Sequence, residues 1–310
     1  EEPMRAYDRV HLSEYFSGRD AESLALGETS LYQTPGVTLH LGVPVLEIDR
    51  YAHQVVTAHD RLHYAKLVLA TGCRTLTFPF GQDEIIHFRT VDDYERLRSA
   101  PAHGDRFAVI GGGFIGSEIA AALAMNRKKV MWIFPDEFVG SRMYPPELAR
   151  SLSELYRERG VEVIAGAKVT GCESRDGEST LTVHDSQSGA DRKIVVDGVV
   201  AGIGVQPNVE LAQAAGLSVD NGIRVDASLR TDNPDIYAAG DVASIFDPML
   251  EEWRRVEHED CANTMGAHAG VAMAGRTVSY EHRPFFYSDI FEMGYEAVGE
   301  VDSRLDMITD

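Results

Sequence analysis

One glycine motif constrains the fold of this chain more than any other feature. Residues 107–110 form an apolar run that leads into a G-x-G-x-x-G, and residues 130–134 form a second apolar run. Between them, apolar residues recur at helical spacing. In such a motif the first glycine permits a tight turn, the second lets a pyrophosphate approach bare backbone, and the third lets the helix pack closely on the strand. The glycines are Gly111, Gly113 and Gly116. The pattern predicts a strand–turn–helix–strand unit with a dinucleotide at the helix N-terminus, a tight turn without a ligand being the alternative.

An acidic residue after the second apolar run bears on which dinucleotide binds. Asp136 follows Gly116 by 20 residues, where a carboxylate accepts hydrogen bonds from a ribose diol. The 2′-phosphate of NADPH would be repelled by Asp136 and by Glu137 beside it. The sequence therefore favours NADH.

Length and charge limit the classes of protein to which the chain can belong. Its 310 residues exceed what one core usually fills, so two domains and part of a third are expected. No apolar run approaches the roughly 20 residues that a membrane helix needs. The formal net charge of −20 argues against nucleic acid and anionic membranes as partners. It also weighs against a strongly acidic electron-transfer partner, unless basic residues gather on one face.

The cysteines point to a reducing compartment. Cys73, Cys172 and Cys261 lie far apart and form no C-x-x-C pair. We expect free thiols in an intracellular, cytoplasmic protein, with neither a disulfide-exchange site nor a metal site. The chain opens with a glutamate instead of methionine, which leaves open whether an N-terminal segment has been lost.

Residues before the glycine motif read as strands and one helix. Alternation predicts strands at 37–49, 54–58 and 62–69, the last leading into Ala70, Thr71 and Gly72. Residues 88–98 predict a helix that Thr90 caps.

After the motif, residues 145–160 predict a helix whose apolar face comprises Leu148, Leu152 and Leu155. A third parallel strand is expected at 161–165, and shorter antiparallel strands over 169–204.

The last third of the chain contains two candidate site residues. An apolar strand ends at Gly240 and Asp241, and an acid at the carboxyl end of a parallel strand faces the crevice where such sheets bind ligands. Asp241 is therefore a candidate sugar or ribityl ligand, or else a helix N-cap. His258 follows a charge cluster, which on local grounds indicates a salt-bridged surface. Small residues over 262–275 predict a helix whose Met and Ala stripe is core, and residues 285–300 predict two short strands.

Three motifs together, ATG at 70–72, the glycine motif and AAGD at 238–241, resemble the FAD-dependent pyridine-nucleotide oxidoreductases of the glutathione-reductase structural class. The stretch YDRVHLSEYF from Tyr7 is similar to the flavin module of nitrite reductase large subunits. The stretches IFPDE, GVQPNVELA, RRVEHED and YSDIFEMGYEAVGEVDS are similar to apoptosis-inducing factor and its microbial relatives. Ferredoxin-reductase-like proteins carry a proline-rich version of the first stretch with a lysine, where this chain has Ser13 and Glu14.

The resemblance implies an α/β fold with two Rossmann-like, three-layer ββα domains. An FAD domain would comprise residues 1–90 and 232–278, an inserted NADH domain residues 91–231, and the start of a C-terminal interface domain residues 279–310. The family's first βαβ unit, with its own glycine motif for FAD, would precede Glu1. The clusters that bind siroheme or iron–sulfur are absent from the sequence, as is the cysteine that peroxide-forming relatives place after Arg9.

The same resemblance assigns the site residues. FAD would contact Glu1, Arg9, Val45, Ala70, Thr71, Gly72, Gly240, Asp241 and Val242. NADH would contact Gly111, Gly113, Phe114, Ile115, Gly116, Glu118, Asp136, Arg142 and Gly204. Glu118, Glu257 and His258 would border the flavin and the nicotinamide, and no side chain need act as acid or base because the cofactors carry the chemistry.

The implied function is hydride transfer from NADH to FAD, followed by electron transfer to an acceptor that the sequence does not identify. A redox protein, a partner reductase module, a quinone and oxygen all stay open, as does a homodimer. One alternative is a slow, NADH-responsive assembly protein like apoptosis-inducing factor. Another is a dinucleotide-binding scaffold without catalysis.

Overall fold

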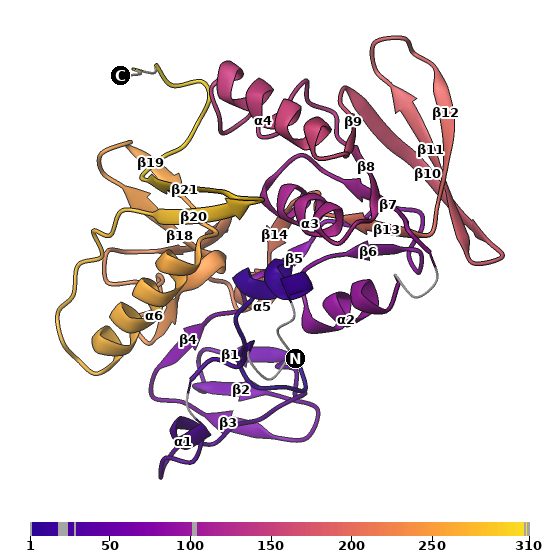
Figure 1. The fold of residues 1–310 in the computed structure, drawn as a ribbon. Coiled ribbons are helices and arrows are strands. Elements are labelled where there is room, and N and C mark those ends of the chain that lie inside the picture. The colour runs from indigo at the N-terminus through magenta and orange to yellow at the C-terminus, as the bar shows by residue number, and fades with distance from the viewer. Residues whose placement is uncertain (1, 18–23, 28, 101–103, 307, 309–310) are drawn as a thin grey trace. The chain divides into compact units, whose positions relative to one another are not determined.

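The computed structural model describes residues 2–17, 24–27, 29–100, 104–306 and 308, and the chain divides into two compact units (Figure 1). The first unit comprises residues 1–7, 25–74 and 206–286. The second comprises residues 8–24, 75–205 and 287–310. Each unit is described separately.

The second unit is built on a five-stranded parallel sheet with the strand order β6-β13-β7-β8-β9. Its centre is the glycine-motif unit: β7 (Arg106–Ile110), α3 (Phe114–Met125) and β8 (Lys129–Ile133) follow one another as predicted. The outer strands are β6 (Ile85–His87), β13 (Gly198–Ala201) and β9 (Glu162–Ile164). The third parallel strand expected at 161–165 is therefore confirmed as β9.

A three-stranded antiparallel sheet forms a second layer of this unit. It comprises β10 (Ala167–Arg175), β11 (Glu178–Asp185) and β12 (Asp191–Val196), which confirms the predicted antiparallel excursion. Leu181, Val183 and Val196 of this sheet share one hydrophobic core with Ala108 of β7 and Ile133 of β8. With α3, which packs on β7 and β8, the unit has the three ββα layers that were expected.

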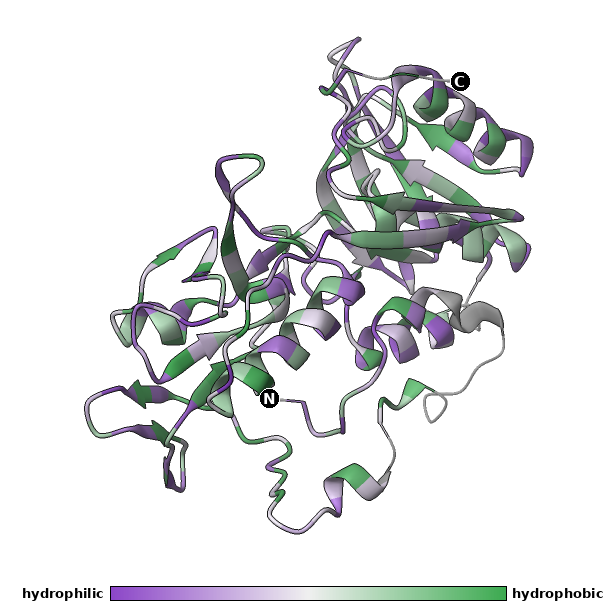
Figure 2. Cartoon of the chain, turned by 90° about the vertical axis from the view of Figure 1, so that its left-hand side faces the viewer, coloured by the Kyte–Doolittle hydropathy of each residue, from purple (hydrophilic) through white to green (hydrophobic). Residues whose placement is uncertain are grey.

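Helices complete the second unit. In α2 (Val91–Ser99), Thr90 and Asp93 form the predicted cap, as a reciprocal capping box. In α4 (Pro146–Glu158), Leu152 is buried but Leu148 is 47 % exposed. The predicted leucine face was wrong at Leu148 because the buried stripe lies one residue further along. That stripe is Ala149, Leu152, Ser153 and Tyr156. Figure 2 shows such helices as alternating hydrophobic and hydrophilic bands.

The 3₁₀ helix η1 (Val10–Ser17) also belongs to the second unit and packs on α3. At the other end of the chain, β20 (Phe285–Ile290) and β21 (Met293–Val298) are the two expected short strands. They form a two-stranded sheet that we call the C-terminal hairpin, and β20 begins at the border between the units.

The first unit contains several small sheets around one core. β4 (Leu67–Leu69) pairs in parallel with β17 (Ile236–Ala238). A four-stranded sheet has the order β15-β16-β18-β19, from β15 (Val219–Asp220), β16 (Gly222–Val225), β18 (Ala243–Asp247) and β19 (Glu252–Arg254). The helices are α1 (Thr29–Tyr32), α5 (Glu210–Ala214), η4 (Gly240–Val242) and α6 (Glu259–Met273). Met265 and Ala269 of α6 lie in the core, which confirms the core interpretation of that helix.

The strand predicted at 37–49 was wrong for most of its length. Only β1 (Glu47–Asp49) forms, because Gly42 turns the chain with a φ of +64° and Pro44 has no N–H to give to a ladder. The strand predicted at 62–69 divides into β3 (Arg61–His63), which pairs with β2 (Gln54–Val56), and β4, which pairs with β17.

The remaining strands, β5 (Cys73–Thr75) and β14 (Val205–Pro207), pair where the chain passes from one unit to the other. The compact units follow chain contacts, whereas the predicted domains follow the cofactor that each would bind. The two divisions differ at residues 8–24, 75–90, 206–231 and 279–286. All three cysteines are free, as expected. Among the described residues, no helix has the length and apolar character that crossing a membrane requires.

Candidate functional site

The glycine turn between β7 and α3 has two positions that exclude a side chain and one that faces open space. A Cβ on Gly111 would lie 2.2 Å from the Gly202 carbonyl oxygen, and one on Gly116 would lie 2.0 Å from the Gly111 carbonyl oxygen. Gly111 also has a φ of +111°, a conformation that favours glycine. By contrast, a Cβ on Gly113 would meet nothing within 4 Å. The turn therefore leaves bare backbone open to an approaching group at Gly113.

The N-terminus of α3 is prepared for an anion. Gly113 is the N-cap residue, it makes no side-chain cap hydrogen bond, and the first turn, which begins at Phe114 and Ile115, has no acidic residue. The first N–H groups of a helix have no intrahelical partners and carry the positive end of its dipole. The indole of buried Trp132 donates a hydrogen bond of 2.8 Å to the Gly111 carbonyl and so fixes the turn. Sequence reasoning missed this role of Trp132, since nothing local distinguishes it from a core residue.

Asp136 follows β8, the strand next to β7, so its carboxylate comes from the same sheet edge as the glycine turn. The backbone carbonyl of Asp136 accepts a hydrogen bond of 3.0 Å from the Gly166 N–H. Its carboxylate lies 3.8 Å from the guanidinium of Arg142, whose side chain is 82 % exposed. This arrangement leaves the Asp136 carboxylate accessible to hydroxyl donors. Gly204, with a φ of +105°, comes after β13 on the other side of β7, and its carbonyl accepts from the Leu76 N–H.

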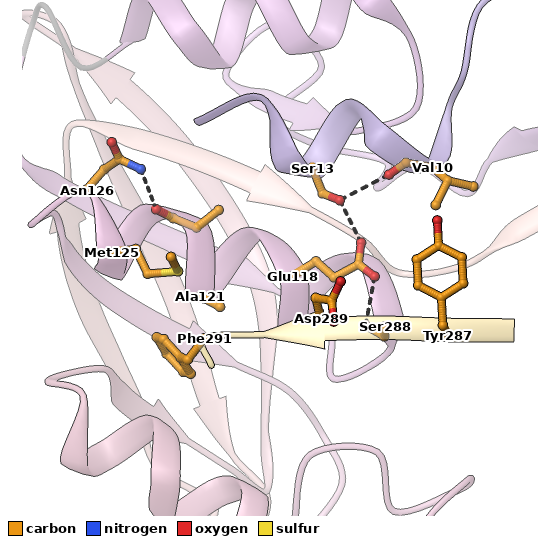
Figure 3. A pocket seen from close by; sticks show the side chains of 11 residues that line it. Val10, Ser13, Glu118, Ala121, Met125, Asn126, Tyr287, Ser288, Asp289 and Phe291 are labelled. Carbon is orange, nitrogen blue, oxygen red and sulfur yellow. Dashed lines mark hydrogen bonds between the residues drawn. The ribbon is translucent and has the colours of Figure 1, made fainter. Parts of the chain in front are cut away.

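Glu118, one turn into α3, lies at a cavity of about 370 Å³ between α3, η1 and the C-terminal hairpin. One carboxylate oxygen accepts a hydrogen bond of 2.8 Å from the Ser13 hydroxyl, and the other accepts one of 3.0 Å from the Ser288 hydroxyl (Figure 3). In the sequence, Ser13 precedes Glu14, the position at which ferredoxin-reductase-like proteins have a lysine. No local signal connected Ser13 or Ser288 with Glu118.

In the first unit, two turns follow neighbouring parallel strands. Leu69 of β4 is in register with Ala238 of β17, so Ala70, Thr71 and Gly72 leave the sheet beside Gly240 and Asp241. The Thr71 hydroxyl donates to the Asn208 carbonyl at 2.8 Å, and the Asn208 amide returns a hydrogen bond of 2.7 Å to the Thr71 carbonyl. Asp241 lies inside η4, whose N-cap is Ala239, so the N-cap alternative for Asp241 was wrong.

Arg255 is hydrogen-bonded to the backbone of the turn that contains Asp241. Its guanidinium, on a side chain only 8 % exposed, donates to the Asp241 carbonyl at 3.2 Å and lies 3.2 Å from the Cys73 sulfur. It also pairs with the Glu257 carboxylate at 2.7 Å. Sequence reasoning treated this arginine only as part of a charge cluster.

His258 is packed against an aromatic ring. It is the N-cap residue of α6, and its ring stacks on Phe286 with the centroids 4.4 Å apart and an interplanar angle of 14°. Burial lowers the pKa of His258, although Asp241 and Asp260 oppose the shift. The imidazole is therefore neutral at physiological pH.

The other candidate residues have varied surroundings. Arg9 donates to the Arg89 carbonyl at 3.1 Å, Val45 packs against the core of the first unit, and Val242 is buried within it. Glu1 lies outside the described residues.

Comparisons with known proteins identify the family. A model of the pyridine nucleotide-disulphide oxidoreductase family matches residues 1–269, and a model of the C-terminal region of mitochondrion-associated apoptosis-inducing factor matches residues 269–309. The chain is 38 % identical over 299 residues to the ferredoxin–NAD(+) reductase component of an anthranilate 1,2-dioxygenase system from Burkholderia cepacia, covering 94 % of this chain and 72 % of that protein. It is 33 % identical to putidaredoxin reductase from Pseudomonas putida, covering 92 % and 69 %. The crystal structure of a covalent putidaredoxin reductase–putidaredoxin complex matches with a TM-score of 0.89 and 31 % identity, covering 96 % of this chain and 73 % of that chain.

Proposed function

Because the chain belongs to the pyridine nucleotide-disulphide oxidoreductase family, we propose that it accepts hydride from NADH on FAD and delivers the electrons to a small redox protein. The chain is an FAD-dependent NAD(P)H oxidoreductase, as its relatives are. One observation best supports NADH as the electron donor. The backbone at Gly113 is exposed and faces open space, and Gly113 is the N-cap residue of α3.

In this proposal the second unit binds the NADH. The pyrophosphate lies against Gly113 and the first N–H groups of α3, where the helix dipole stabilises its charge. Asp136 accepts hydrogen bonds from the adenosine ribose, and its charge disfavours NADPH. Phe114, Ile115, Arg142 and Gly204 line the rest of the site, and Glu118 meets the nicotinamide.

The first unit offers features that fit a flavin nucleotide. Thr71 and Gly72 come from β4 and Asp241 comes from the neighbouring β17, at the carboxyl edge where α/β sheets bind ligands. The Asp241 turn is anchored through its backbone carbonyl by Arg255. In our proposal Ala70, Gly240 and Val242 lie along the ribityl chain with Asp241, and Val45 contacts the adenine by its backbone. The family resemblance also implies FAD contacts for Glu1 and for Arg9, which belongs to the second unit.

When bound, FAD supplies the two-electron to one-electron conversion that an NADH-driven carrier needs. The protein orients the two rings and excludes water between them. The neutral imidazole of His258, stacked on Phe286, offers an uncharged wall for this purpose, and Glu257 lies one residue before it. No side chain has to gain or lose a proton during the hydride step.

The relatives' names bear on the proposed acceptor. Two relatives are named as reductases of ferredoxin and of putidaredoxin, which supports a small redox protein over a quinone or oxygen. Since this chain carries a formal charge of −20, the proposed carrier would dock through a basic face of its own or onto a local basic patch here.

A second candidate function has its own observation. The match of residues 269–309 to the C-terminal region of apoptosis-inducing factor favours an NADH-responsive assembly protein with slow turnover.

Reoxidation after anaerobic treatment with one equivalent of NADH separates the two. The FAD-loaded protein is mixed in a stopped-flow instrument with ferredoxin-type carriers, a quinone, ferricyanide or oxygen. We expect fast reoxidation by at least one carrier and slow reoxidation by oxygen. Slow reoxidation by all of them, with persistent long-wavelength absorbance and a change in mass by light scattering, would favour the assembly protein.

A further inference from the structure

The Glu118 carboxylate is held by hydroxyls from two segments that are far away in the sequence. Ser13 is 105 residues before Glu118 and Ser288 is 170 residues after it, and each donates to a different carboxylate oxygen. Both serines are buried, Ser13 with 7 % and Ser288 with 2 % of the surface exposed. Neither serine is open to bulk water, but the single proton of the Ser13 hydroxyl also has the Val10 carbonyl as an acceptor at 3.2 Å (Figure 3). The Glu118 carboxylate is therefore held at the edge of its cavity mainly from the side of Ser288.

Ser288 is itself connected to further hydroxyls in the second unit. Tyr295 of β21 is near enough for the Ser288 hydroxyl to lower the Tyr295 pKa, against the larger opposing effect of burial. The Tyr144 hydroxyl in turn donates to that of Tyr295, and the two rings meet edge to face with centroids 5.5 Å apart. Burial raises the pKa of Tyr295 and of Tyr144, so both remain protonated donors at physiological pH. Since the single Ser288 proton is used on the Glu118 carboxylate, we infer that Tyr295 is the donor between these two hydroxyls, which would make a chain from Tyr144 to Glu118.

Such a chain strengthens the final hydrogen bond, because each hydroxyl that accepts a proton donor becomes a better donor itself. Hydrogen bonds to a charged acceptor are also stronger than those between neutral groups. Loss of the Ser288 hydroxyl would therefore displace the Glu118 carboxylate. A displacement of about 1 Å in a binding site weakens the interaction with the ligand strongly.

We propose that Ser288 and Tyr295 of the C-terminal hairpin are positioning residues that orient Glu118 toward the nicotinamide half of NADH. This inference rests on the proposed function, in which Glu118 meets the nicotinamide. It gives the hairpin a role in the nucleotide site to which none of its residues was assigned, and Ser13 has the same role from the side of η1.

The test compares NADH with ADP-ribose, which has the same adenosine and pyrophosphate but no nicotinamide. Binding of each to the full chain is measured by calorimetry for the wild type and for Ser288→Ala. We expect Ser288→Ala to weaken NADH binding by about fivefold to tenfold, the effect of one charge-assisted hydrogen bond, and to leave ADP-ribose binding within about twofold. Tyr295→Phe should act in the same direction with about a twofold effect, since it removes only the second donor.

The matched control is Ser117→Ala. Ser117 is also a buried serine next to Glu118, but its hydroxyl donates back to the Phe114 carbonyl within α3. It should not change the ratio of the two affinities. If Ser288→Ala does not fold, Ser13→Ala and Tyr295→Phe provide the same comparison.

Each other outcome overturns the inference. Equal weakening of both ligands in Ser288→Ala would mean that the hydroxyl only stabilises the fold. Unchanged NADH affinity in Ser288→Ala, Ser13→Ala and Tyr295→Phe would refute the positioning role and leave the proposed function standing. A wild-type chain that binds ADP-ribose but gains nothing from the nicotinamide would contradict both.

Discussion

At the scale of single residues, the three motif glycines do different work, and only two of them are needed for folding. Gly111 and Gly116 would each place a Cβ within about 2 Å of a carbonyl oxygen, whereas Gly113 has open space. The motif already predicted steric roles for Gly111 and Gly116 and a ligand approach at Gly113. The distances agree with the two steric roles, and the ligand approach at Gly113 stays a prediction.

We therefore expect Gly116→Ala and Gly113→Ala to differ in kind. Gly116→Ala should lower the free energy of unfolding by about 2–4 kcal/mol, because a carbonyl at 2.0 Å cannot give way without moving the turn. Gly113→Ala should change it by less than about 1 kcal/mol while weakening NADH binding roughly tenfold, because its methyl lies where the pyrophosphate approaches. Chemical denaturation and calorimetry measure the two effects. Equal destabilisation by both would contradict the assignment.

The carboxylate of Asp136 tests the identity of the donor. Asp136→Ala should weaken NADH binding by about 1–2 kcal/mol through the lost ribose hydrogen bonds and narrow the preference for NADH over NADPH. Glu137→Ala is the control for the NADH affinity alone, since this adjacent exposed acid is expected to act only on the 2′-phosphate of NADPH. An unchanged NADH affinity in Asp136→Ala would remove this residue from the site.

At the scale of elements, an ion-pair cluster ties β7 to the turn between β12 and β13. The Asp197 carboxylate accepts from the backbone N–H groups of Asp105 and Arg106 at 2.9 Å and pairs with the Arg106 guanidinium at 2.6 Å. The Asp197 side chain is only 10 % exposed. These contacts, the Arg106 guanidinium first, lower the pKa of Asp197 to about 2.

This pKa predicts a pH window for stability. A carboxyl whose pKa is lower in the folded state contributes fully above its unfolded pKa of about 3.9, and the contribution is lost as the pH falls toward 2. Asp197→Asn should therefore lower the free energy of unfolding by about 1–2 kcal/mol at pH 7. The difference from wild type should shrink between pH 4 and pH 2, as measured by urea denaturation across that range. A difference that stays constant down to pH 2 would refute it.

The sequence predicted those helices and strands whose causes lie within a few neighbouring residues. The glycine unit, the Thr90 cap and the antiparallel strands over 169–204 followed from signals within a few residues. The strand expected at 37–49 failed because alternation was weighed above Gly42 and Pro44, and Leu148 failed because helix phase depends on the neighbours of α4. Contacts such as Ser288 with Glu118, or Arg255 with the Asp241 turn, join residues distant in sequence. No local pattern reveals such contacts.

At the scale of the whole molecule, the central claim is that two nucleotide sites in one chain cooperate in hydride transfer. The family, the fold and the cofactors are common to the relatives, while the individual contacts remain proposals. The division into an FAD domain at 1–90 and 232–278 and an NADH domain at 91–231 also stays a prediction, as do the cytoplasmic location and a homodimer. The claim can be tested by substituting Asp136 in the proposed NADH site and Asp241 in the proposed FAD site.

The most direct measurement is anaerobic reduction of the FAD-loaded protein by NADH and by NADPH, followed through the visible absorbance of the flavin. The account predicts that NADH bleaches this absorbance rapidly, that NADPH does so at least about tenfold less efficiently, and that Asp136→Ala narrows the gap. It also predicts that Asp241→Ala loses FAD on gel filtration while still binding NADH. A flavin that is retained but not bleached by NADH would contradict the central claim.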